Sequence, residues 1–231
     1  MIMQPVSVGG PPTPASSAPA AIIDSEDPAV KEFAAVAAGG CADNRGAAVA
    51  IYYAVRDGFR YDPYTVDLSI AGLSASGVLQ SGRGWCIPKA ALMAACCRAV
   101  GIPARVGLAD VRNHLATRKL LDMLGTDVFY CHGYTSVWLE GRWIKATPAF
   151  NRELCTRAGI APLEFDGCVD SINHPFDLAG QRHMEYLAMH GEFDEVPRDY
   201  VVATLTQRYP SLKQLPGSDW DEDIEEEFKA S

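Results

Sequence analysis

The chain has 231 residues, of which 48% are hydrophobic and 21% charged, and its formal net charge is −9. This composition is typical of a globular protein with one buried core, and the negative charge argues against unspecific nucleic-acid binding, which needs a basic face. No run approaches the roughly 20 apolar residues of a membrane helix, and residues 1–21 lack the basic and apolar regions of a secretory signal.

The two ends of the chain differ in composition from its middle. Residues 1–24 are rich in Pro, Ala and Ser, which predicts a disordered lead-in. Residues 211–231 are crowded with Asp and Glu, which predicts a mobile acidic tail. One domain is therefore expected over residues 25–210.

The first part of the domain is predicted to be helical. Asp27-Pro28 is typical of an N-cap followed by Pro at the first helical position, so a helix is expected from Pro28 to about Ala38. A second helix follows Asp43 or Asn44 and ends near Gly58. Residues 59–77 are expected to be irregular and rich in turns.

A buried helix and a set of strands follow. Residues 87–100 are apolar nearly all round, which predicts a central helix that Gly101 and Pro103 end. Residues 104–111 predict a strand and residues 114–124 a short helix. Residues 129–139 and 142–147 predict an antiparallel pair joined by a turn at Glu140-Gly141. Farther on, a helix over residues 184–190 and a short element over residues 201–208 are expected.

The cysteine pattern predicts reduced thiols. The seven cysteines are an odd number, two of them are adjacent, and no CxxC pair is present. This pattern argues against a disulfide framework and against a structural zinc site, and a cytoplasmic location without metal is expected.

Cys86 is the candidate nucleophile. It lies where a turn containing Gly82 and Gly84 enters the buried helix. Unpaired N–H groups at a helix start favour a thiolate, which is the reactive form of cysteine. The other six cysteines are interpreted as packing residues.

His132 is the candidate base. Strand alternation places it on one face with Tyr134, while Cys131 points to the other face. The turn at Glu140-Gly141 pairs His132 with Ala149, so Thr147 and Asn151 become diagonal neighbours that could orient the imidazole.

These residues occur in runs that resemble a known family. The runs are Gly84-Trp85-Cys86 at the helix start, the stretch from Arg98 through Gly101-Ile102-Pro103 to Arg105, and His132 followed by Trp138, Trp143 and Thr147-Pro148. Together, over about residues 47–151, they resemble the transglutaminase-like superfamily of papain-type thiol enzymes.

The resemblance implies an α+β, papain-like core in which N-terminal helices, including the nucleophile helix, pack on an antiparallel sheet. It also implies a Cys–His–Asp catalytic triad, with Cys86 as nucleophile and His132 as base. The chain departs from the family at Thr147, where an Asp is usual, and Asn151 is the other candidate for the third member. Gln80, six residues before Cys86, is the candidate oxyanion donor, as in papain-like proteases.

The expected activity is acyl transfer or hydrolysis at an amide or peptide bond through a Cys86 thioester, as in a cysteine protease or amidase. The substrate would be a peptide, a protein or a small amide, with no cofactor, nucleic acid or membrane involved. The alternative is a catalytically inactive binding module that keeps the fold. An arylamine N-acetyltransferase and a peptide N-glycanase fit the motifs less well.

Overall fold

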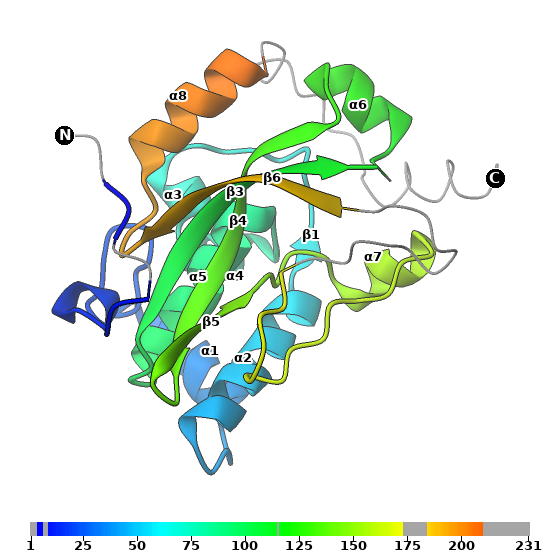
Figure 1. Cartoon of the computed structure of the whole chain (residues 1–231). Coiled ribbons are helices and arrows are strands. Elements are labelled where there is room, and N and C mark those ends of the chain that lie inside the picture. Colours follow the sequence, from blue (N-terminus) through cyan, green and yellow to red (C-terminus); the bar gives the residue numbers. More distant parts are fainter. Residues whose placement is uncertain (1–3, 7–8, 115, 173–183, 210–231) are drawn as a thin grey trace.

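The computed structural model describes residues 4–6, 9–114, 116–172 and 184–209, and it has the expected α+β architecture. Helices from the N-terminal half pack against a four-stranded antiparallel sheet, as Figure 1 shows. The strand order is β5-β4-β3-β6, so β3 and β4 are the two central strands. The expected arrangement of a helical layer on an antiparallel sheet is confirmed.

The helices and strands have the following bounds. The helices are η1 (Pro14–Ser16), α1 (Pro28–Ala37), α2 (Asn44–Gly58), α3 (Ile70–Leu73), α4 (Ala75–Ser81), α5 (Cys86–Ala99), α6 (Arg118–Leu124), α7 (Arg152–Arg157) and α8 (Arg198–Arg208). The strands are β1 (Arg60–Tyr61), β2 (Arg83–Gly84), β3 (Ala104–Asn113), β4 (Val128–Leu139), β5 (Arg142–Ala146) and β6 (Met184–Phe193). Strands β1 and β2 form a separate parallel pair.

Side-chain caps begin the first two helices. The Asp27 carboxylate accepts hydrogen bonds from the backbone N–H groups of Ala29 and Val30, and the Asp43 carboxylate accepts one from Gly46. These acceptors satisfy N–H groups that have no partner inside the helix. The predicted helix starts at Pro28 and Asn44 are confirmed.

Helix α5 lies at the centre of the core, where it packs against α1, α2, α4, β3 and β4. Every residue from Cys86 to Arg98 is buried, including Lys89. The Lys89 ammonium donates to the carbonyls of Arg56 and Phe59 at the end of α2, at 2.9 and 2.6 Å. Burial lowers the pKa of Lys89 to about 7. These bonds fix α5 against the end of α2.

Arg98, near the end of α5, joins distant parts of the chain. Its guanidinium donates to the carbonyl of Ala104 at the start of β3, to Ala18 in the N-terminal segment, and to Asp194 after β6. The side chain is buried, and within the described part of the chain its hydrogen bonds go to backbone oxygens. It therefore connects three segments to α5.

The N-terminal segment is packed rather than free within the described residues. Ile22 and Ile23 are buried in the core, and the Trp143 indole N–H donates to the Gly10 carbonyl at 2.7 Å. This differs from the disordered lead-in that composition predicts for residues 1–24. A few apolar side chains and backbone carbonyls suffice to anchor a Pro- and Ala-rich segment. The predicted acidic tail, residues 211–231, lies outside the described residues.

The expected helix over residues 184–190 is wrong, because these residues form strand β6, the antiparallel neighbour of β3. The segment has Met, Glu, Leu and Ala, which favour helices, but the open edge of β3 provides hydrogen-bond partners for a strand, and tertiary pairing outweighs propensity. The turn-rich segment after Phe59 also contains α3 and α4, which begin at Ser69 and Ser74 caps.

Strand β4 packs against α5 through one face. On that face the Thr135 hydroxyl donates to the Ala90 carbonyl at 2.9 Å. Gly133, two residues earlier, contacts the start of α5 so closely that an added Cβ would lie 2.8 Å from Ile87 Cα. The absence of a side chain at Gly133 therefore allows β4 to approach the helix start. Within the described residues, no helix has the length and apolar character needed to cross a bilayer.

Gly133→Ala is expected to destabilise the fold by about 1–3 kcal/mol, because the new methyl would push α5 away from β4. Urea unfolding followed by circular dichroism measures the change. Gly58→Ala is the matched control: nothing lies within 4 Å of an added Cβ there, so its stability should be unchanged or raised. Equal stability of the two variants would contradict this role of Gly133.

Candidate active site

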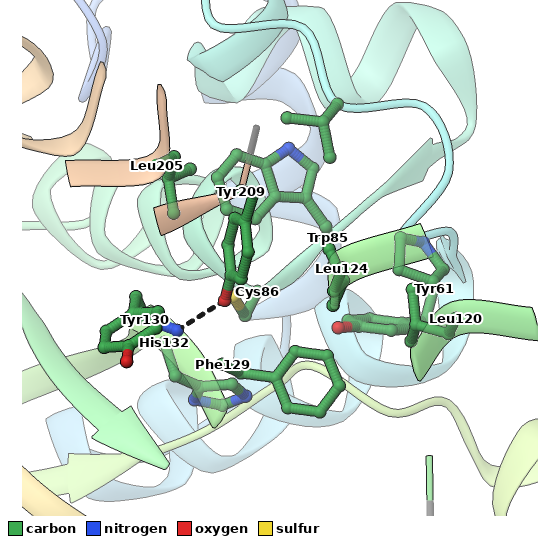
Figure 2. Close-up of a pocket in the computed structure, with 12 residues that line it drawn as sticks. Tyr61, Trp85, Cys86, Leu120, Leu124, Phe129, Tyr130, His132, Leu205 and Tyr209 are labelled. Atoms are coloured by element: carbon green, nitrogen blue, oxygen red, sulfur yellow. Dashed lines mark hydrogen bonds between the residues drawn. The ribbon is translucent and has the colours of Figure 1, made fainter. Parts of the chain in front are cut away.

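Cys86 and His132 line one cavity, between the start of α5 and strand β4 (Figure 2). Helix α6, the segment around Pro63, the end of α8 and Tyr209 supply most of its other walls. The two candidate residues are 46 positions apart in sequence, and the packing of α5 on β4 brings them to the same cavity.

The Cys86 side chain is buried, with 6% of the residue exposed. Burial raises the pKa of its thiol to about 11, although hydrogen bonding from the backbone of Gly133 and Ile87 acts in the opposite direction. The helix start alone was expected to favour the thiolate. In the structure desolvation outweighs it, so Cys86 is a neutral thiol near pH 7.

The His132 ring is enclosed even more completely, with 3% of the residue exposed. Among the described residues, neither ring nitrogen has a hydrogen-bond partner. Burial lowers the pKa of His132 to about 4. The resting site therefore contains a neutral thiol and a neutral imidazole, which can still accept a proton.

A kink in β4 precedes His132. Cys131 has a φ of 58°, in the left-handed region that residues other than glycine seldom adopt. Its backbone N–H donates to the Asp110 carboxylate on β3 at 3.1 Å, and the same oxygen lies 2.8 Å from Nε2 of His190. This kink breaks the regular alternation of side chains directly before His132. The direction of the imidazole therefore cannot be derived by counting residues from Tyr130.

The two candidates for the third catalytic member have other partners. The Thr147 hydroxyl donates to the Ile172 carbonyl at 3.5 Å, a long bond. The Asn151 side-chain oxygen accepts from the Tyr61 backbone N–H at 3.1 Å. Both residues are buried, but neither hydrogen bonds to His132. The choice between them stays a prediction.

Gln80 lies near the end of α4 and is exposed. It lines a different hollow, together with Asp67 and Arg83, and that hollow shares only Trp85 with the cavity of Cys86. The backbone N–H groups near the sulfur are those of Gly133, Ile87 and Cys86 itself. These amides are nearer candidates for an oxyanion site than Gln80.

Sequence reasoning missed Tyr209, which follows α8 and closes part of the cavity. Its hydroxyl accepts from the Tyr130 backbone N–H at 2.6 Å, drawn in Figure 2, and donates to the Val128 carbonyl at 3.0 Å. No motif surrounds Tyr209 in sequence. Sequence reasoning also missed Asp110, whose carboxylate accepts from the kinked backbone at Cys131. An acidic residue in the otherwise apolar run of β3 could have indicated a structural role.

The described residues include no group of three or more His, Cys, Asp or Glu side chains that could hold a metal ion. All seven cysteines are unpaired. The polar groups among the described lining residues of the cavity are the Cys86 thiol, the His132 imidazole, the Trp85 indole N–H and the tyrosine hydroxyls.

Comparison with known families identifies the fold. The model of the transglutaminase-like superfamily matches residues 31–148, just over half of the chain. The chain belongs to the transglutaminase-like superfamily. The matched range contains Cys86, His132 and Thr147, and the expectation drawn from their motifs is confirmed at the level of the family.

Two solved structures resemble this transglutaminase-like protein. A "putative cysteine protease" from Cytophaga hutchinsonii has a TM-score of 0.46 and 18% identity, over 76% of this chain and 53% of that one. A "putative protease" from Parabacteroides distasonis has a TM-score of 0.36 and 17% identity, over 58% of this chain and 26% of that one. The chain thus spans about half and a quarter of their lengths. No curated protein matches it.

Loss of stability in mild acid is expected from His132 of the transglutaminase-like domain. Its pKa is lower in the folded than in the unfolded state, so unfolded chains bind the proton first and stability falls as pH decreases from 6.5 towards 4. Between roughly pH 7 and pH 5, protonation of this group should lower the free energy of unfolding by about 2 kcal/mol. Denaturant unfolding at both values measures it.

His132→Phe should lack this contribution, whereas His114→Gln, which changes a partly exposed histidine, should keep it. If the free energy of unfolding of His132→Phe still fell between pH 7 and pH 5 as in the wild-type protein, the imidazole would not be buried as described.

Thiol labelling provides a second test. Iodoacetamide at pH 7 should modify the exposed Cys41 of the transglutaminase-like domain well before the buried Cys86. Labelling of Cys86 should increase as the pH approaches 11, because the thiolate is the reacting form. Peptide mass mapping over time measures both sites, and urea-unfolded protein is the control. Preferential labelling of Cys86 at pH 7 would contradict the assigned burial.

Proposed function

We propose that this transglutaminase-like protein is a thiol acyltransferase or hydrolase that acts at an amide or peptide bond. Cys86 is the nucleophile and His132 the general base. The observation that carries the proposal is that both side chains line one apolar cavity, with the sulfur at the start of α5.

The reaction begins from neutral partners. A bound carbonyl places its carbon near the Cys86 sulfur, His132 takes the thiol proton, and the S–C bond forms. The backbone amides beside the sulfur donate to the developing oxyanion. When the tetrahedral species collapses, the C–N bond breaks, His132 gives its proton to the leaving amine, and a thioester remains on Cys86.

The second half restores the enzyme. Water or an amine attacks the thioester carbon and gives a proton to His132. The C–S bond breaks, and the sulfur recovers that proton. Water yields a carboxylic acid, as in a protease or amidase, and an amine yields a new amide. Neutral resting partners suit this sequence because no charge is buried until the substrate is bound.

The remaining site assignments are part of the proposal. Thr147 or Asn151 would orient the imidazole by giving up its present hydrogen-bond partner, and Gln80, which lines the neighbouring hollow, would be an accessory oxyanion donor. A peptide, a protein or a small amide would be the substrate, without cofactor, nucleic acid or membrane. The seven unpaired cysteines support a cytoplasmic, reducing setting.

An inactive binding module is the second candidate. Thr147 stands where the family usually has Asp, and the imidazole has no orienting partner among the described residues. A carboxylate would stabilise the charged imidazolium more strongly than a hydroxyl can. Such a module would keep the cavity for binding and form no thioester.

Acylation by p-nitrophenyl acetate separates the two candidates. The wild-type protein should gain one acetyl group on Cys86, detected by intact mass and peptide mapping, because the site forms a thioester. Cys86→Ser should lose this adduct, and Cys41→Ser should retain it. His132→Phe should slow acylation, whereas Gln80→Ala should lower the rate by at most about 10²–10³. Absence of a Cys86 adduct on the wild-type protein would favour the binding module.

A further inference from the structure

The wall of the cavity that contains Cys86 is almost wholly apolar. Helix α6 provides Leu120 and Leu124, the C-terminal region provides Leu205 and Tyr209, and β4 provides Phe129. None of the described residues that line the cavity is Asp, Glu, Lys or Arg. A charged group placed here would lose its hydration without gaining a partner, which is costly.

The cavity is also small. Its volume is about 50 Å³, and on this scale one water needs about 10–15 Å³. The space therefore corresponds to about three to five waters, or an acyl group of about two to four carbons. A longer acyl chain would exceed this volume.

The closure of the cavity depends on side chains that are themselves held in place. Tyr209 is tied to the backbone of β4 by two hydrogen bonds, and Leu120 and Leu205 are 2% and 3% exposed. These fixed walls and the small volume favour a small free molecule over a glutamine or lysine on the surface of a folded protein.

Buried nitrogen atoms that lack hydrogen-bond partners indicate where the polar carbonyl end of a ligand would lie in the cavity. Both nitrogens of His132 and the indole nitrogen of Trp85 are buried without hydrogen-bond partners among the described residues, and both side chains line the cavity. Buried polar atoms are usually satisfied. A carboxamide or ester group could supply partners for the imidazole.

We propose that the cavity selects small, uncharged acyl compounds: a short apolar acyl chain of about two to four carbons on a carboxamide or a related carbonyl group. This inference rests on the proposed acyl-transfer function and specifies its substrate class. The acyl chain occupies the apolar part of the cavity, and its carbonyl carbon meets the Cys86 sulfur. The bonds made and broken are those already given for thioester formation.

Four p-nitrophenyl esters test this selectivity: acetate, butyrate, hexanoate and the anionic hemisuccinate, whose acyl chain has the same number of carbons as butyrate. The rate of Cys86 acylation is followed by nitrophenolate release and intact mass. Each rate is divided by that of the same ester with free glutathione, which corrects for intrinsic reactivity. Butyrate should exceed hemisuccinate by about tenfold or more, because the carboxylate must be desolvated. Acetate and butyrate should exceed hexanoate.

Two leucines of α6 provide matched variants. Leu124→Ala enlarges the cavity and should raise the hexanoate rate relative to that of butyrate. Leu121→Ala removes the same atoms from a residue of the same helix that does not line the cavity, and should leave the ratio unchanged. If the corrected wild-type rates were equal for butyrate, hexanoate and hemisuccinate, the proposed selectivity would be wrong. The proposed acyl-transfer function of Cys86 would still stand. No adduct with any ester would overturn both proposals.

Discussion

The close approach of β4 to the start of α5 is the constraint on which the candidate site depends. Gly133 lacks a side chain where any Cβ would meet the backbone of Ile87, so strand and helix pack at backbone distance. This packing brings the amide of Gly133 to the Cys86 sulfur, and His132 precedes that amide in sequence. A single glycine thus determines the spacing between the helix that carries the candidate nucleophile and the strand that carries the candidate base.

Burial gives this site a particular resting state. A helix start favours a thiolate, but burial disfavours any charge, and for Cys86 the second effect is larger. Burial likewise keeps His132 neutral. The pair differs from a preformed thiolate–imidazolium pair, so in the proposed reaction proton transfer would accompany attack on a bound carbonyl. Because the thiolate is the form that reacts with oxidants and alkylating agents, the raised pKa of Cys86 should also slow these reactions near pH 7.

The sequence was sufficient to predict the helices from Pro28 to Gly58, the central helix, and the strands β3, β4 and β5, since capping residues, glycines and apolar periodicity act locally. It also led to the family. It did not predict β6, because that strand depends on the edge of β3. It did not predict the kink at Cys131, because the carboxylate that holds it comes from a neighbouring strand. The closure by Tyr209 likewise depends on contacts between residues about 80 positions apart, with separations of 79 and 81.

Arg98 extends the folding unit beyond the region matched by the family model. Its guanidinium holds backbone oxygens of Ala18, Ala104 and Asp194, so segments before and after the matched region are joined through one buried cation. A shortened version of the protein that began at residue 25 would remove the Ala18 oxygen and uncover surface now covered by Ile22 and Ile23. A buried donor without an acceptor costs about 1–3 kcal/mol. The smallest autonomous version of this fold therefore includes its Pro-rich N-terminal segment.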